Sequence, residues 1–123
     1  MTLRVGNITV DCTDTMRVAR FWAAALGRPL DAASGPGFAS IGTADPDRTE
    51  PAWLFETVPE GKVAKNRLHL DFIDPDHSAV GRLVALGAVV LAEHQLGEGG
   101  HSWTVMADPE GNEFCVARGT YTG

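Results

Sequence analysis

Apolar and polar side chains alternate near the start of the chain, with the two-residue period of a strand. Over residues 3–12 the apolar positions share one face and the polar positions share the other: Ile8, Val10 and Cys12 against Asn7, Thr9 and Asp11. Residues 14–26 change to the helical period, with one apolar stripe: Val18, Phe21, Trp22, Ala25 and Leu26. Asp14 can cap this helix and Gly27 can end it. The pattern therefore predicts a strand followed by an amphipathic helix.

Two further strands are predicted in the first half of the chain. Residues 35–43 are entered through glycines, and residues 53–58 are rich in aromatic and β-branched side chains. Residues 43–51 between them have the composition of a turn. The polar and basic stretch 61–66 then predicts a linker.

The same order of elements begins again after this linker. Residues 67–73 alternate, and their apolar side chains share one face: Leu68, Leu70 and Phe72. Asp74 followed by Pro75 predicts the start of a helix that continues to Leu86. Its apolar stripe is made of Ala79, Val80, Leu83 and Leu86. Three strands complete the second half, at residues 88–93, 102–107 and 113–118.

An internal repeat explains why the order recurs. A shift of 60 positions superimposes like residues at capping and packing positions: Asp11 on Asp71, Asp14 on Asp74, Ala19 on Ala79, and Ala25-Leu26-Gly27 on Ala85-Leu86-Gly87. A repeat unit that cannot bury its own apolar face must pair with its copy. The sequence therefore predicts one α+β domain over residues 1–123. Two tandem βαβββ modules, at about residues 3–60 and 66–118, would form a curved mixed sheet around a cup.

The side of the strands away from the helices carries the candidate binding residues. If each helix covers the apolar side of its sheet, alternation turns the polar side chains toward the cup. A concave face with convergent polar groups and nearby aromatic rings is the usual place for a ligand. We expect a small molecule to bind here, with two tryptophans as apolar walls, through Asn7, Thr9, Trp53, Glu56, His69, Asp71, Trp103, Glu113 and Cys115.

Composition and charge narrow the range of partners. The 123 residues fit a single domain, and 44% hydrophobic and 21% charged residues are ordinary for a globular protein. A net charge of −6 argues against nucleic acid and against an anionic membrane surface as partners. The start of the chain lacks the pattern of a secretory signal, and no run approaches the ~18 apolar residues of a membrane span. We therefore expect a cytoplasmic protein with reduced cysteines at Cys12 and Cys115.

Three stretches carry a resemblance to known proteins: KNRLHLD at residues 65–71, LVALGA at 83–88 and WTVMADPEGNEFCV at 103–116. On these residues the chain resembles the vicinal oxygen chelate superfamily, also called the glyoxalase, bleomycin-resistance and extradiol-dioxygenase group. Within it, the chain is most similar to the glyoxalase-like branch. The resemblance covers nearly the whole chain and implies the paired-module fold. It implies no particular reaction, because that fold hosts lyases, epimerases, dioxygenases and drug-sequestering proteins.

The resemblance also bears on metal binding. In metal-dependent members of the superfamily, His and Glu ligands come from the first and last strand of each module. Carried over to this chain, the second-module histidine is His69, but the glutamate after the DPxGN turn falls at Cys115. In the first module the equivalent positions are Asn7 or Thr9, neither of which is histidine, and Glu56. Only His69 and Glu56 therefore match a usual ligand type.

Three interpretations of His69 stay open at this point. It could bind a divalent metal (Zn, Ni, Mn or Fe) together with Glu56. It could instead form hydrogen bonds to a ligand in a metal-free pocket, together with Glu56 and Asp71. Finally, it could belong to a polar network with Asp71 or Glu113 and have no direct role. We prefer the metal-free pocket.

The favoured function is thus the binding of a small apolar or aromatic molecule in the cup, with no cofactor and no classical metal triad. The alternative is a metal-assisted enzyme, a lyase or isomerase or a dioxygenase-like protein, whose metal would stabilise a developing enolate. The sequence does not decide whether the protein is an enzyme. A third hypothesis is a dimeric interaction domain. In each case we expect a homodimer with an isologous contact.

Overall fold

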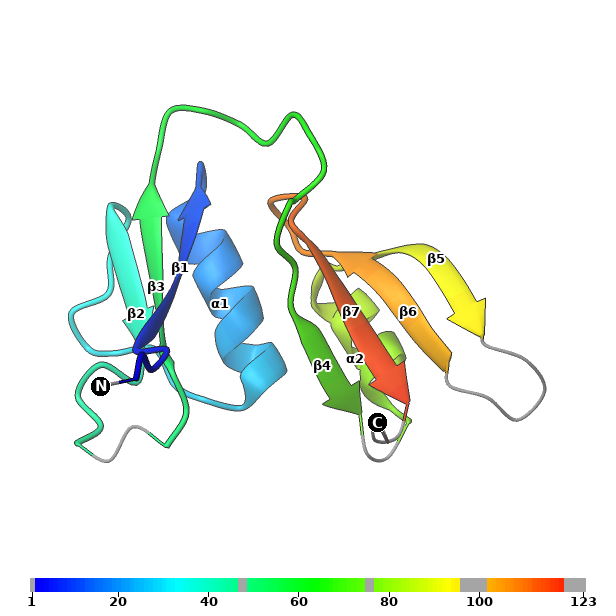
Figure 1. Ribbon diagram of the computed structural model, residues 1–123. Helices are drawn as coiled ribbons and strands as arrows, with labels where there is room; N and C mark the ends of the chain where they lie inside the picture. Colours follow the sequence, from blue (N-terminus) through cyan, green and yellow to red (C-terminus); the bar gives the residue numbers. More distant parts are fainter. Residues whose placement is uncertain (1, 47–48, 75–76, 96–101, 119–123) are drawn as a thin grey trace. The chain divides into compact units, whose positions relative to one another are not determined.

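A computed structural model describes residues 2–46, 49–74, 77–95 and 102–118 of the chain. The chain divides into two compact units, Met1–Gly61 and Lys62–Gly123. Each unit combines one helix with a small mixed sheet (Figure 1). The predicted α+β fold, built from two modules of similar order, is confirmed.

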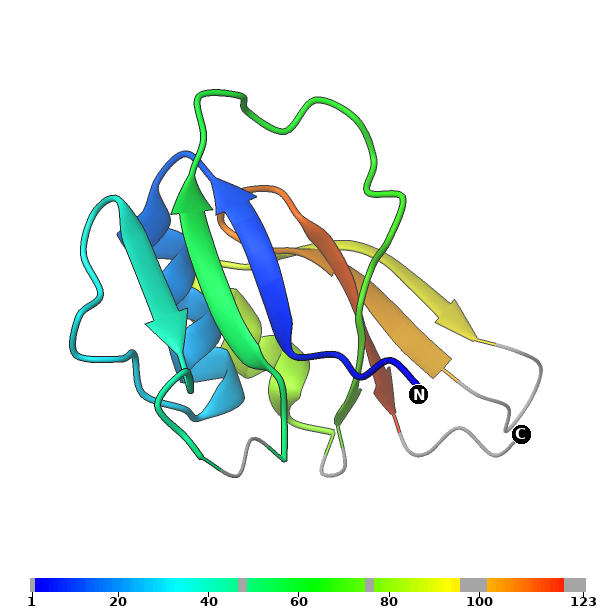
Figure 2. The same ribbon diagram turned by 60° about the vertical axis from the view of Figure 1, so that its left-hand side comes forward.

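The first unit contains β1 (Asn7–Cys12), α1 (Thr15–Leu26), β2 (Phe38–Ile41) and β3 (Ala52–Thr57). Its strands lie in the order β1-β3-β2, with β1 parallel and β2 antiparallel to β3 (Figure 2). Between α1 and β2 the chain forms isolated antiparallel bridges rather than a strand, and one of them joins Leu30 to Ile41 of β2. That bridge stands where the second unit has a full strand.

The second unit contains β4 (Asp71–Asp74), α2 (Ala79–Leu86), β5 (Val89–Gln95), β6 (Ser102–Ala107) and β7 (Glu113–Arg118). Its strands lie in the order β4-β7-β6-β5. The first strand is parallel to the last, as in the first unit, and the remaining pairs are antiparallel. Both units therefore share one βαβββ topology, with the strand after the helix reduced to Leu30 in the first.

The first helix agrees with the prediction. Asp14 caps it by accepting a hydrogen bond from the backbone N–H of Arg17 at 3.3 Å. Gly27 ends it in the left-handed conformation, at φ 64°, which glycine adopts without a steric cost. The predicted stripe faces the sheet and buries Val18, Phe21 and Trp22.

The second helix is shorter than predicted, because it begins at Ala79 rather than just after Asp74. Asp74 still caps it from a distance: its buried carboxylate accepts a hydrogen bond from the N–H of Ala79 at 2.9 Å. His77 lies between them at φ 62°, a conformation that ends regular structure. Pro75, on which the predicted start relied, lies outside the described residues.

Several predicted strands also begin later than expected, among them the strand predicted over residues 35–43, which begins at Phe38. The strand predicted over residues 3–12 begins at Asn7, and the strand predicted over 67–73 begins at Asp71. Leu68 consequently does not pack under α2, and its side chain is 84% exposed. The alternation of apolar and polar residues therefore extends beyond the residues that form strands.

An apolar run at residues 83–92 is only partly buried. Leu83 and Ala88 are buried, whereas five larger apolar residues along the run are exposed: Val84, Leu86, Val89, Val90 and Leu91. Leu86 was expected to belong to the buried stripe. Of the helices in the described ranges, neither has the length and hydropathy needed to cross a bilayer.

Candidate functional site

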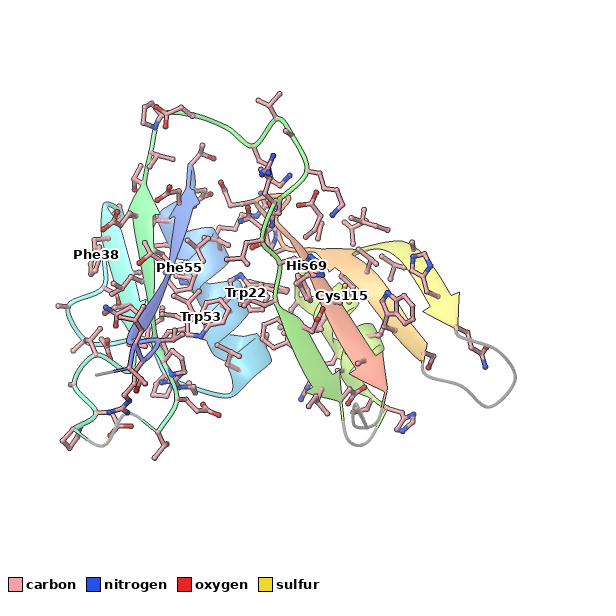
Figure 3. The ribbon with its side chains drawn as sticks, viewed as in Figure 1. Trp22, Phe38, Trp53, Phe55, His69 and Cys115 are labelled. Atoms are coloured by element: carbon pink, nitrogen blue, oxygen red, sulfur yellow. The ribbon has the colours of Figure 1, made fainter. Side chains whose placement is uncertain are left out.

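The second unit brings three potential ligand groups together. His69, Asp71 and Cys115 each present one donor atom, and these atoms lie within 4.8 Å of one another. His69 Nε2 is 3.4 Å from Asp71 Oδ1. Figure 3 shows His69 close to Cys115, beside β4 and β7. Of the expected site residues, these three form one cluster.

Strand pairing explains this proximity. Because β4 runs parallel to β7, Asp71 lies directly beside Cys115. The backbone N–H of Cys115 also donates to the carbonyl of Leu70 at 2.9 Å, so the pairing extends one residue before β4. His69 stands two residues before Asp71, which brings its side chain to the same edge of the sheet.

The sheet has one face covered by α2 and one turned away from it. Asp74, which caps α2, and the buried Val116 mark the covered face. The alternate positions Asp71 and Cys115 must then point the other way. Across β7 the same face continues to Val105 of β6, which pairs with Cys115.

Electrostatics keep the thiol of Cys115 protonated. Burial raises its pKa most, and the negative charge of Asp71 and the hydrogen bond that the thiol donates to this carboxylate raise it further. The positive charge of Lys65 opposes this in part. A thiol needs to ionise before it can attack, so Cys115 is poorly suited to be a nucleophile at neutral pH. Cys115 and Cys12 are both buried, and neither forms a disulfide with a described residue.

Glu113 is engaged by the segment that leads into the second unit. Its carboxylate lies 3.1 Å from Lys62 Nζ and accepts a hydrogen bond from the N–H of Asn66 at 3.2 Å. The Asn66 side chain donates to the Glu113 carbonyl at 3.2 Å. Burial alone would raise the pKa of Glu113, but these hydrogen bonds and the Lys62 charge hold it below its ordinary value. The geometry gives Glu113 a part in holding this segment.

Trp103 lies on the face turned away from α2, where it stacks on a residue that we did not single out. The rings of Trp103 and His94 are 5.1 Å apart and inclined by 22°. The two residues face each other across β6 and β5. Alternation along residues 88–93 could not reveal this pair, because a bulge between Val90 and Ala92 shifts the register before His94.

The candidate residues of the first unit lie on two different faces. Asn7, Thr9 and Glu56 are on the face turned away from α1, where Glu56 is paired with Asp11 of β1. Trp53 lies on the opposite face, toward α1. This corrects the expectation that it forms an apolar wall of the ligand site. It is 4% exposed, and its ring lies 4.9 Å from that of Trp22 in α1 (Figure 3).

A comparison with models of known protein families shows which family the chain belongs to. The model of the glyoxalase-like domain matches residues 7–117, which is nearly the whole chain. The chain belongs to the glyoxalase-like domain family. The resemblance to the vicinal oxygen chelate superfamily is thereby confirmed. No curated protein matches this glyoxalase-like chain.

Solved structures with the same fold include enzymes and resistance proteins. A variant of the fosfomycin resistance protein FosX from Listeria monocytogenes, complexed with manganese(II) and 1S,2S-dihydroxypropylphosphonic acid, is 16% identical at a TM-score of 0.75. The match covers 98% of this chain and 93% of that one. A glyoxalase/bleomycin resistance protein/dioxygenase family enzyme from Burkholderia phytofirmans is 18% identical at 0.69, covering 94% and 98%. A lactoylglutathione lyase from Agrobacterium tumefaciens is 15% identical at 0.61, covering 96% and 95%. At these identities the likeness establishes the fold alone.

The donor set of the cluster tests which metal the glyoxalase-like chain could hold. One imidazole, one carboxylate and one thiol match the ligand types of a zinc site with three protein ligands. Manganese prefers oxygen ligands, and the thiol of Cys115 fits it poorly. Glu56, the other expected ligand, belongs to the first unit and is not part of this cluster.

Proposed function

We propose that this glyoxalase-like protein binds a small molecule with an apolar or aromatic part on the sheet face turned away from α2. One observation carries the proposal: the polar cluster of His69, Asp71 and Cys115 and the ring of Trp103 share that face. Polar groups that fix orientation beside an apolar ring are the usual composition of a ligand site. Asn7, Thr9 and Glu56 stay proposed binding residues on the first unit's own sheet face, the one turned away from α1.

The cluster supports binding without a metal. The side chains of His69 and Asp71 are 41% and 49% exposed, so solvent and ligands can reach them. Cys115 keeps its proton, as burial and the charge of Asp71 favour the neutral thiol. A metal would have to displace that proton, which weakens its binding at neutral and lower pH.

A second function is supported by the same three donors. In this alternative, His69, Asp71 and Cys115 hold a zinc ion, and the protein is a metal-assisted lyase or isomerase. The metal would polarise the oxygens of a substrate and stabilise negative charge that develops on them. His69 Nε2 and Asp71 Oδ1 lie 3.4 Å apart, close enough for one ion to bind both.

Metal content and thermal stability separate the two functions. Purified protein would be measured for bound Zn, Ni, Mn and Fe and then melted with and without a chelator. The favoured function predicts less than one-tenth equivalent of metal, no change in Tm with chelator, and stabilisation by an aromatic compound. Stoichiometric zinc that disappears in a Cys115→Ser variant, together with a large drop in Tm on chelation, would instead establish the metal-assisted alternative.

The remaining proposals concern partners and location. We infer a cytoplasmic homodimer that binds neither nucleic acid nor membranes. The net charge of −6 supports the lack of nucleic-acid and membrane partners. The exposed apolar side chains Val89, Val90 and Leu91 on the edge strand β5 support self-association.

A further inference from the structure

The stacked pair of Trp103 and His94 differs from the other aromatic contacts of the protein. Trp22 and Trp53 are each 4% exposed and pack against each other inside the first unit. Trp103, by contrast, is only half-buried, and the His94 ring that stacks on it is exposed. A cross-strand pair can stabilise a hairpin without any other role. Two stacked rings that solvent reaches can additionally extend their stack by one ligand ring.

The pair also lies at a defined distance from the polar cluster. Trp103 pairs with Ala117, which is two residues beyond Cys115 along β7. From the spacing of strands and the rise per residue, Trp103 and Cys115 are roughly 8 Å apart. The side chains between them on this face are small, namely those of Ala117 and Val105. That separation matches one substituted six-membered ring.

We propose that the ligand carries a planar aromatic ring that stacks on the Trp103–His94 pair and a polar substituent that reaches His69. This inference rests on the proposed function and narrows its ligand to single-ring aromatic compounds with a polar group. His94 then becomes a specificity residue, because its ring stacks on the indole and holds the plane on which the ligand ring would stack. A saturated ring of equal size would bury similar area but would lose the stacking. Stacking of this kind corresponds to about three- to tenfold in Kd.

Matched pairs of probes test this directly. The test uses 4-hydroxybenzoate with its saturated counterpart trans-4-hydroxycyclohexanecarboxylate, and a panel of single-ring acids and phenols paired in the same way. Each is titrated into the full, isotope-labelled chain while the NMR signals of the Trp103 indole N–H and the His69 amide are followed. We expect at least one aromatic member to shift both signals together, with a Kd about three- to tenfold below that of its saturated partner.

Two variants on the same strand sharpen the test. His94→Ala should reduce the preference for the aromatic member to less than twofold, because the Kd of the aromatic member weakens more than that of the saturated member. Glu93→Ala is the matched control: Glu93 pairs with Thr104 and so points to the opposite face from His94. The control should keep the wild-type preference.

The outcomes distinguish the inference from the function on which it rests. Aromatic and saturated members that bind equally well near His69, without shifting the Trp103 signal, would overturn the aromatic inference and leave the proposed function standing. A panel that shifts neither signal would contradict both. An aromatic preference that survives His94→Ala would remove His94 from the site.

Discussion

Asp71 favours the neutral thiol of Cys115 at the centre of the candidate site. Its carboxylate accepts from the thiol of Cys115 and lies 3.4 Å from His69 Nε2. Its negative charge therefore adds to burial in raising the pKa of the Cys115 thiol and keeping that thiol neutral. This arrangement suits the binding of a polar ligand group better than nucleophilic attack by sulfur.

The Asp71→Asn variant should make Cys115 more reactive. Removing the carboxylate charge lowers the pKa of this thiol. The alkylation rate at pH 8 should rise about three- to fourfold for each pKa unit removed, because a larger thiolate fraction is partly offset by weaker nucleophilicity. Mass spectrometry of each cysteine during iodoacetamide treatment measures this rate. Cys12 is the internal control, because it is buried in the other unit and should not change. An unchanged rate at Cys115 would show that Asp71 does not govern its ionisation.

The Glu113→Gln variant tests the attachment of residues 62–66. Losing the charged contact with Lys62 should lower the free energy of unfolding at pH 7 by about 1–2 kcal/mol. The folded-state pKa of Glu113 is lowered, so its stabilising effect is present above the unfolded pKa and is lost as pH falls through the folded pKa. Denaturant melts at pH 7 and pH 3 should therefore show a difference between variant and wild type that shrinks in acid. A difference that stays constant would contradict the assigned charge.

At the scale of elements, Gly42 is needed where the chain turns after β2. It adopts φ 75°, and a Cβ there would collide with the guanidinium of Arg28. That guanidinium donates to the Pro51 carbonyl at 3.0 Å and so connects the end of α1 to the start of β3. We expect Gly42→Ala to cost about 1–2 kcal/mol of unfolding free energy.

Gly35→Ala is the control for this substitution. A Cβ at Gly35 would meet no atom within 4 Å, and its φ lies outside the left-handed region. Its effect on urea-induced unfolding should stay within about 0.5 kcal/mol. Equal effects of the two substitutions would refute the role given to the turn.

The periodicity of the sequence predicted which helices and strands form better than it predicted where they begin and end. The strands Ser102–Ala107 and Glu113–Arg118 agree residue for residue, because turn residues bound them closely. The predicted start of α2 was wrong. Asp74 caps the helix from five residues away, by accepting from Ala79, instead of from the position next to its first residue. The alternation around Leu68 looked like a strand, but the ladder with β7 begins only at Asp71.

The candidate site was predictable only where the strands are regular. Alternation correctly grouped Asp71 with Cys115, because β4 and β7 pair without a bulge. It missed His94, because the bulge in β5 changes which face that residue occupies. Trp53 was assigned to the wrong face of β3. The sequence of this strand does not show whether its aromatic or its acidic residues face α1.

At the scale of the whole molecule, the two units repeat one topology but differ in chemistry. Asp14 and Asp74 cap equivalent helices, and Gly27 and Gly87 end them at positive φ. The cluster with metal-ligand chemistry, however, occurs only in the second unit among the described residues. The two units thus share a topology, and the different residues on their strands account for the difference in chemistry.

The predicted homodimer is tested by sedimentation. We expect a species of twice the chain mass at micromolar concentration. Leu91→Lys should shift it toward the monomer, because it introduces a charge into the exposed apolar part of β5. Arg82→Lys is the matched control, because it also introduces a lysine but leaves the charge unchanged. A wild-type protein that stays monomeric at every concentration would refute self-association.

The most direct test of the account is the effect of His69→Ala on Kd for the compound that most raises the Tm of the wild-type protein. We predict at least a tenfold weaker Kd with an unchanged far-UV spectrum and Tm, because the imidazole would contact the ligand without supporting the fold. His77→Asn is the control, since His77 is an exposed histidine outside the cluster and asparagine tolerates its positive φ. Equal Kd values for wild type and His69→Ala would contradict the claim that the ligand binds at this cluster.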